Sequence, residues 1–188
     1  LYSDINIDQL IFRDQKVGDV SILNQWDQEE HAVKSEMKII SNDRQNLIAS
    51  GSYNPESREL LYHAEFDHLS LVVLETIIRN NFSNFHGDGT GKLKIHGTPD
   101  KILLTGAVEG LNAGLTIDYT QVSYNFTDSV FFKGDTILFD QISMKDLAGN
   151  RGTFEGTIVH TNFQDMKYNL AVYSPRLTAM NTTATTGA

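Results

Sequence analysis

The chain has no cysteine, no long apolar run and no excess of basic residues, and each absence excludes a class of protein. Without cysteine there are no disulfides and no thiolate chemistry. No apolar run approaches the roughly eighteen residues of a membrane-spanning helix. The formal net charge is -9 at pH 7 and no basic stripe is present, although nucleic acids and anionic membrane surfaces attract lysine and arginine. We therefore expect no nucleic-acid partner and no membrane span within this chain.

The short motifs that catalysis or cofactor binding would require are incomplete. The glycine-rich run from Gly87 to Lys92 has neither the spacing of a phosphate-binding loop nor that of a dinucleotide fingerprint, so it predicts a flexible turn. His63 and His68 flank Glu65 but stand five residues apart, whereas a metal-binding pair on a helix is separated by four. No serine lies in the nucleophile motif of hydrolases. We expect no enzymatic activity, no catalytic residue, no cofactor and no metal.

What the sequence does contain is alternation of apolar and polar residues. Residues 115–119, 122–126 and 166–172 have an apolar side chain at every second position, and eleven of the 14 glycines separate such segments between residues 86 and 172. Because successive side chains of a strand point to opposite sides, each segment would have one apolar and one polar face. The pattern predicts an all-β protein whose strands span about 20 Å each, at roughly 3.3 Å per residue.

The period changes once, after residue 66. Leu69, Val72, Val73 and Ile77 fall near helical spacing, which predicts a single short helix over residues 68–82 that plugs an open end of the sheet. Expected strands before it lie at residues 20–23, 37–40, 47–53 and 60–66, and expected turns lie at 16–19, 41–44, 97–100 and 162–165. The chain would then comprise a strand block (1–66), the helix (67–82), a glycine-punctuated β block continuous with the first (83–175) and a tail (176–188).

Several loose motifs of glycine, aspartate and apolar residues follow one another in a fixed order across nearly the whole chain. They are residues 14–26 with Val17-Gly-Asp-Val20 and Trp26-Asp27, residues 60–71, Gly87-x-Gly-x-Gly-x-Leu-x-Ile-x-Gly97 with Pro99 and Gly106, Tyr124-x-Phe126, Ile137-x-Phe139, Asp146-x-x-Gly-Asn-x-Gly152, Gly156-x-Ile-x-His160, Phe163-x-Asp165 and Met180-Asn-Thr-Thr183. In this order the chain resembles the repeating module of the TamB proteins, members of the AsmA-like superfamily of bacterial envelope proteins, in their Bacteroidetes-type form.

The resemblance implies a segment of a larger periplasmic protein that is anchored in the inner membrane and reaches the outer membrane. The absence of a methionine or signal peptide at Leu1 agrees with such a segment. In such relatives the body is a sheet folded lengthwise into a taco-like trough with an apolar interior groove. Family function is outer-membrane biogenesis, described either as phospholipid transport between the membranes or as outer-membrane protein assembly and secretion with a TamA- or BamA-like barrel. No catalytic residues come with the resemblance.

Physical chemistry favours the lipid interpretation. A two-chain phospholipid exposes roughly thirty methylenes in water, and at about 0.8 kcal/mol each the barrier to transfer is of order 20 kcal/mol. An apolar groove that contacts phospholipid acyl chains would remove most of this barrier. A packed core, as in a secreted β-sandwich binding module, would give the same alternation, so both interpretations stay open here. The candidate groove residues are Leu93, Ile95, Ile102, Leu104, Val108, Leu115, Ile117, Val122, Tyr124, Phe126, Phe154, Ile158, Met166, Tyr168 and Leu170.

Overall fold

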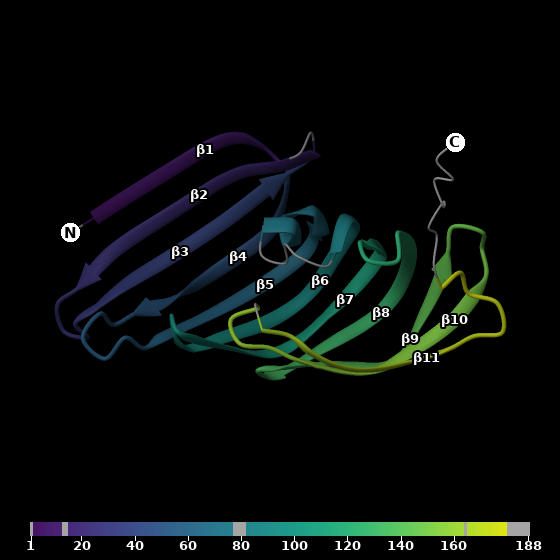
Figure 1. The fold of residues 1–188 in the computed structure, drawn as a ribbon. Coiled ribbons are helices and arrows are strands. Elements are labelled where there is room, and N and C mark those ends of the chain that lie inside the picture. The colour runs from purple at the N-terminus through teal and green to yellow at the C-terminus, as the bar shows by residue number, and fades with distance from the viewer. Residues whose placement is uncertain (1, 13–14, 77–81, 164, 180–188) are drawn as a thin grey trace, which may run out of the picture.

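The protein folds into a single open β-sheet. A computed structural model describes residues 2–12, 15–76, 82–163 and 165–179. In this part of the chain eleven strands form one antiparallel sheet in chain order, and one 3-10 helix interrupts the series (Figure 1). The predicted all-β class is confirmed. The elements are β1 (Tyr2–Phe12), β2 (Gln15–Asp27), β3 (Ala32–Ser41), β4 (Arg44–Tyr53), β5 (Leu60–Ser70), η1 (Leu71–Thr76), β6 (Phe82–Thr98), β7 (Lys101–Ile117), β8 (Val122–Gly134), β9 (Thr136–Asp146), β10 (Arg151–Val159) and β11 (Lys167–Tyr173).

Short turns explain why each strand pairs with the next. Between β3 and β4 the connection is Asn42-Asp43, and both residues have positive φ, at 54° and 59°. Two such residues match the twist of a tight hairpin, and Asn and Asp tolerate this conformation. The strands are longer than expected. β6 and β7 each contain 17 residues, which corresponds to roughly 55 Å of extended chain.

The strand register assigns every side chain to one of two faces. Residues directly opposite each other in an antiparallel pair point to the same side of the sheet. Val20 pairs with Ile39, Ile39 with Leu47, and Leu47 with Phe66. We call this side the apolar face. The neighbouring positions, such as Glu65, form the opposite side, which we call the polar face.

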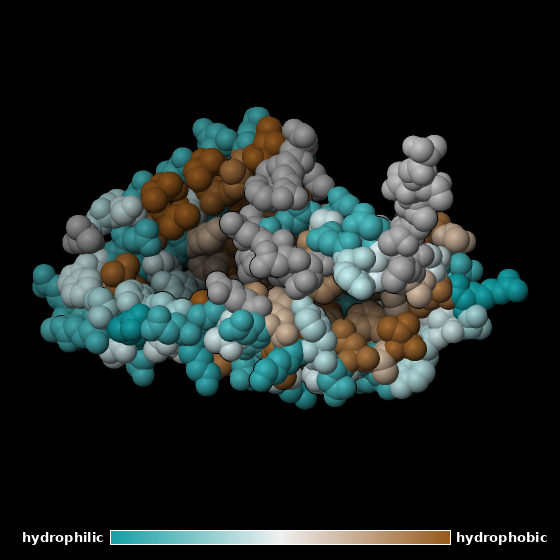
Figure 2. All heavy atoms as spheres, viewed as in Figure 1, coloured by the Kyte–Doolittle hydropathy of each residue, from teal (hydrophilic) through white to brown (hydrophobic). Residues whose placement is uncertain are grey.

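The sheet is strongly curved, and η1 lies on its concave side (Figure 1). Val72 of η1 is 1% exposed and packs in a cluster with Val20, Leu47 and Leu69. The concave side is therefore the apolar face. Figure 2 shows hydrophobic residues over β1 and β2 and in the hollow beside η1.

The predicted helix over 68–82 is wrong in extent and type. Residues 67–70 belong to β5, the 3-10 helix comprises six residues, and residues 77–81 lie outside the described chain. β5 continues past Phe66 because a bulge with His68 at φ 53° restores its pairing with β6 at Leu69. Ladder hydrogen bonds along β6 outweigh the helical spacing of the apolar residues.

Two predicted turns are also wrong, because the glycines in them serve close packing of backbones inside strands. Residues 87–91 lie within β6, and residues 16–19 lie within β2. A Cβ on Gly91 would stand 2.2 Å from the carbonyl oxygen of Ala107 on β7, so only glycine fits there. Gly18 has φ 130° at a register shift opposite Leu10. Of the other predicted turns, those at residues 41–44 and 97–100 are confirmed, and the one at 162–165 includes residue 164, which lies outside the described residues.

Candidate functional site on the apolar face

The structure places the predicted groove residues on one side of the sheet. By register, all of them except Met166 lie on the apolar face. Met166 precedes β11, and its sulfur accepts a hydrogen bond from the Tyr168 hydroxyl at 3.3 Å. Leu104 and Ile158 are buried, Leu170 at the sheet edge is 42% exposed, and most of the others are half-buried. Their contact with lipid stays a prediction.

The face is larger than the predicted set. Both strand blocks contribute to it, because the pairing is unbroken from β1 to β11. Apolar and polar residues alternate within residues 4–66 and along β9 as well. The apolar residues there could therefore have been included in the predicted set. The residues that sequence reasoning left out include Ile5, Ile7, Val20, Ile22, Met37, Ile39, Leu47, Phe66, Val130, Phe132, Ile137, Phe139, Ile142 and Met144.

The 3-10 helix covers one part of the apolar face and is fixed there by a buried carboxylate. Glu75 of η1 is 8% exposed, and its Oε1 accepts a hydrogen bond from the backbone N–H of Phe85 on β6 at 3.0 Å. Phe85 is itself buried. A charge-assisted bond to a strand amide therefore holds η1 against β6 while Val72 packs on the strands below.

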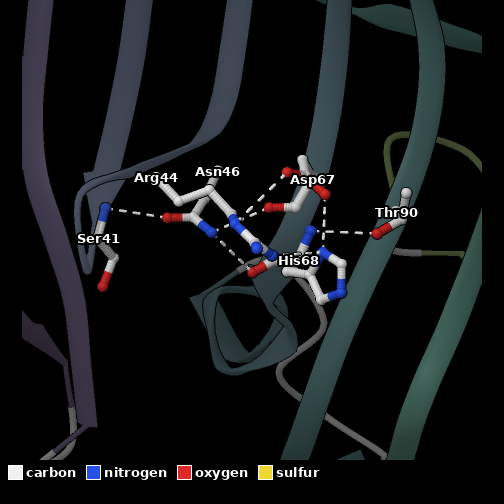
Figure 3. A network of polar contacts seen from close by, with 6 residues as sticks. All are labelled: Ser41, Arg44, Asn46, Asp67, His68 and Thr90. Atoms are coloured by element: carbon white, nitrogen blue, oxygen red, sulfur yellow. Dashed lines mark hydrogen bonds and ion pairs between the residues drawn. The ribbon is translucent and has the colours of Figure 1, made fainter.

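A buried asparagine organises the backbone where β5 passes into η1. Asn46 accepts a hydrogen bond from Ser41 N at 2.9 Å and donates to the carbonyl oxygens of Asp67 at 2.9 Å and His68 at 3.1 Å (Figure 3). The amide of His68 in turn donates to the Thr90 hydroxyl at 3.1 Å. The bonds to Asp67 and His68 satisfy backbone groups at the β5 bulge, and the bond from Ser41 N ties the end of β3 to the same asparagine.

A second segment covers the apolar face at the end away from the 3-10 helix. Residues 174–179 turn back after β11, and Leu177 packs against the cluster of Val122, Tyr124 and Met144. The Tyr124 hydroxyl donates a hydrogen bond to the carbonyl oxygen of Thr178 at 2.6 Å. Both apolar packing and a partly buried hydrogen bond therefore attach this segment to β8 and β9.

Asp146 at the end of β9 is the only acidic side chain among these contacts, and it is 4% exposed. The backbone N–H and the side-chain Nδ2 of Asn150 each donate a hydrogen bond to the Asp146 carboxylate at 2.9 Å. Thr178 donates two more, from its backbone N–H at 3.0 Å and from its hydroxyl at 2.9 Å. The hydrogen bond from the Asn150 side chain has the largest effect on the pKa of Asp146. Together these hydrogen bonds outweigh desolvation and hold that pKa well below its ordinary value of 3.8.

The connection between β10 and β11 contacts the β8–β9 turn and the β6–β7 turn. His160 N donates a hydrogen bond to the carbonyl oxygen of Asp135 at 2.9 Å. Asn162 accepts a hydrogen bond from Ile102 N at 2.8 Å and donates to the Pro99 carbonyl at 3.1 Å, both next to the β6–β7 turn. His160 is 3% exposed, stacks on Phe163 with ring centroids 4.2 Å apart, and has a buried Nε2 without a hydrogen-bond partner in the described chain. Burial lowers the pKa of His160 from its ordinary 6.5, and the charge of Asp135 opposes this only in part.

Between the two covers the apolar face has no second layer of sheet. All strands in the described residues belong to the one sheet, so they do not form the two layers of a sandwich. Central residues such as Ile95, Val108 and Phe132 are half-buried. At the two outermost strands the same face is open, since Ile5 on β1 is 45% exposed and Val172 on β11 is 59% exposed.

The described residues contain no cluster of three or more histidine and acidic side chains that could hold a metal ion. No helix in the described ranges is long and apolar enough to cross a membrane. No family model, curated protein or solved structure matches this chain. The fold and the composition of its two faces are therefore the basis for any functional conclusion.

Proposed function

We propose that this chain is a non-enzymatic, TamB-like segment of a periplasmic protein that conducts phospholipid between the inner and outer membranes along its apolar face. The observation that supports the proposal is the continuity of that face across eleven paired strands. With neighbouring strands about 4.8 Å apart, the face extends roughly 48 Å across the sheet, which is longer than one acyl chain. A lipid moving along it would keep its chains out of water over that distance.

The chemistry of the face suits passage rather than capture. Moving acyl chains from water onto the face is favourable in proportion to the apolar area buried, and it requires no particular contact geometry. Many similar apolar side chains therefore give similar binding free energies at successive positions. Gly91 and Gly106, which are half-buried, reduce the side-chain layer at the centre of the face. Acyl chains can thus approach the backbone of β6 and β7 there.

The proposal is tested by loading the purified protein from vesicles that contain labelled phospholipid and measuring bound lipid by native mass spectrometry. Val108→Glu puts a charge on the apolar face of β7 and should abolish uptake. The control, Thr105→Glu, lies on the polar face of the same strand opposite Lys94 and Lys133, and should take up lipid like the wild type. Circular dichroism checks that both variants fold. A wild type that takes up no lipid, or equal uptake by a folded Val108→Glu variant, would contradict the proposal.

The open edges favour a second candidate function, a scaffold for assembly and secretion of outer-membrane proteins. On their outer sides β1 and β11 pair with no other strand of the described chain. An incoming strand with alternating apolar residues could extend the sheet and cover Ile5, Ile7 or Leu170, as in β-augmentation. The partner would be a nascent outer-membrane strand or a TamA-like barrel. Proline at two successive positions of β11 outside the candidate groove set, Ala171→Pro and Val172→Pro, should abolish this pairing in at least one variant and leave lipid uptake intact.

A further inference from the structure

The polar face contains a hollow that the proposed lipid path does not use. Its volume is about 430 Å³, and it lies over the ends of β7 to β11. Register places Asn125, Lys145 and Arg151 in one row across β8, β9 and β10. A second row, one step further along the strands, consists of Thr127, Ser143, Thr153 and Tyr173. Both rows point away from the apolar face, because their sequence neighbours Tyr124, Phe126 and Met144 belong to it.

The two cations in the first row face each other directly. Arg151 and Lys145 are register partners on adjacent strands, and neither forms an ion pair within the described chain. Like charges at directly opposed positions destabilise a sheet. On the same face Lys92 has an acidic partner, Glu65, at 2.8 Å. In a chain of net charge -9, an uncompensated basic pair in a hollow is a place where an anion would stabilise the fold.

The polar groups of the lining suit a phosphate with a polar substituent, and Phe126, Met144, Gly152 and Pro175 also line the hollow. The arginine guanidinium can donate two parallel hydrogen bonds to a phosphate, and the lysine ammonium adds a point charge. The hydroxyls of Thr127, Ser143 and Thr153 in the second row can donate to further oxygens. Asn125 is positioned by His86, whose Nε2 lies 2.7 Å from Asn125 Oδ1. Two acidic side chains contact lining residues without lining the hollow themselves. Asp128 Oδ2 accepts a hydrogen bond from Ser143 N at 2.8 Å, and Glu155 accepts one from the Tyr173 hydroxyl at 3.2 Å.

We propose that this hollow binds a small phosphate-bearing ligand, with Lys145 and Arg151 contacting the phosphate. The volume exceeds that of a bare phosphate, so there is room for a hydroxylated group attached to it. The same chemistry occurs in a free phosphate ester and in a phospholipid headgroup. The inference is independent of the proposed function, since it concerns the opposite face of the sheet.

The test compares wild type with the double variant Lys145→Gln/Arg151→Gln. Isothermal titration calorimetry with glycerol 3-phosphate at low ionic strength measures the free ligand, and co-sedimentation with phosphatidylglycerol vesicles measures the headgroup. We expect at least tenfold weaker binding by the double variant in whichever assay the wild type binds. Glycerol and phosphatidylcholine vesicles serve as uncharged and zwitterionic controls. Lys133→Gln, a cation on the polar face of β8 outside the hollow, is the matched variant and should bind like the wild type.

Melting temperature provides a second measurement. Glycerol 3-phosphate should raise the melting temperature of the wild type if the free ester is the ligand, because a ligand that binds only the folded state stabilises it. The double variant should melt no lower than the wild type in the absence of ligand, since it removes a repulsion. Wild-type binding to glycerol 3-phosphate identifies a soluble ligand, and binding to vesicles alone identifies a headgroup. Binding to neither, or equal binding by the double variant and the wild type, would overturn the proposal.

Discussion

Asp146 accepts two hydrogen bonds from Thr178, one from the backbone N–H at 3.0 Å and one from the hydroxyl at 2.9 Å. The two residues are 32 positions apart in sequence. Their contact fixes the segment after β11 over the apolar cluster of Val122, Tyr124 and Met144. A carboxylate that is almost fully buried thus closes one end of an otherwise apolar face. If lipid enters or leaves the face at this end, the segment has to move away first.

Asp146→Asn should release this segment and lower the melting temperature by several degrees at neutral pH. Because the pKa of Asp146 is lowered in the folded protein, the carboxylate stabilises the fold fully above pH 3.8 and progressively less as the pH falls through its folded value. The difference in melting temperature between wild type and variant should therefore be constant above about pH 5 and shrink in stronger acid. A difference that is independent of pH would show that the charge contributes nothing. Thermal melts monitored by circular dichroism from pH 3 to pH 7 measure it.

His160 should make the fold sensitive to mild acid. Its pKa is lowered from 6.5 in the folded state, so below pH 6.5 the unfolded chain binds a proton that the folded chain does not, and stability falls. His160→Phe keeps a ring beside Phe163 and removes the titration. The variant should lose less stability than wild type between pH 7 and pH 5 in urea unfolding. His63→Phe, on the exposed side of β5, is the control and should retain the wild-type pH dependence.

Alternation alone was enough to predict the fold class and the faces of the individual strands. It succeeds here because each strand pairs with its neighbour in sequence, so a local pattern maps directly onto the sheet. Within its own strand each of Leu104, Tyr124 and Ile158 is assigned to the apolar side by the period of two, and the register then joins these sides into one face.

Sequence reasoning failed where backbone geometry depends on the neighbouring strand. Gly91 indicates a turn when considered alone, and its role appears only when Ala107 of β7 lies against it. The apolar spacing after Phe66 resembles a helix, but pairing with β6 extends the strand to Ser70. Asp146 looks like an ordinary solvated carboxylate, because nothing near it in sequence reveals that Thr178 will return to bind it.

Asn46→Ala should destabilise the fold by about 3 kcal/mol. The substitution removes three hydrogen bonds and leaves Ser41 N and the carbonyls of Asp67 and His68 to find other partners, and an unsatisfied buried group costs about 1–3 kcal/mol. Asn6→Ala on the exposed face of β1 is the matched control, with an expected change within about 0.5 kcal/mol. Urea unfolding measures both variants. Equal stability of the two would mean that the Asn46 network does not hold the β5 bulge.

Gly106→Ala tests whether close packing of β6 and β7 shapes the centre of the apolar face. Gly106 has φ 139°, and a Cβ there would stand 2.1 Å from the carbonyl oxygen of Lys92. Strain and clash together should cost about 2 kcal/mol or more and separate the two strands locally. Gly149→Asn is the control, since its φ of 82° suits asparagine and nothing lies within 4 Å of its added Cβ. Hydrogen exchange should accelerate at β6 and β7 amides only in the Gly106→Ala variant. Unchanged hydrogen exchange in that variant would show that β6 and β7 can accommodate a side chain at position 106. Close packing at Gly106 would then not shape the centre of the apolar face.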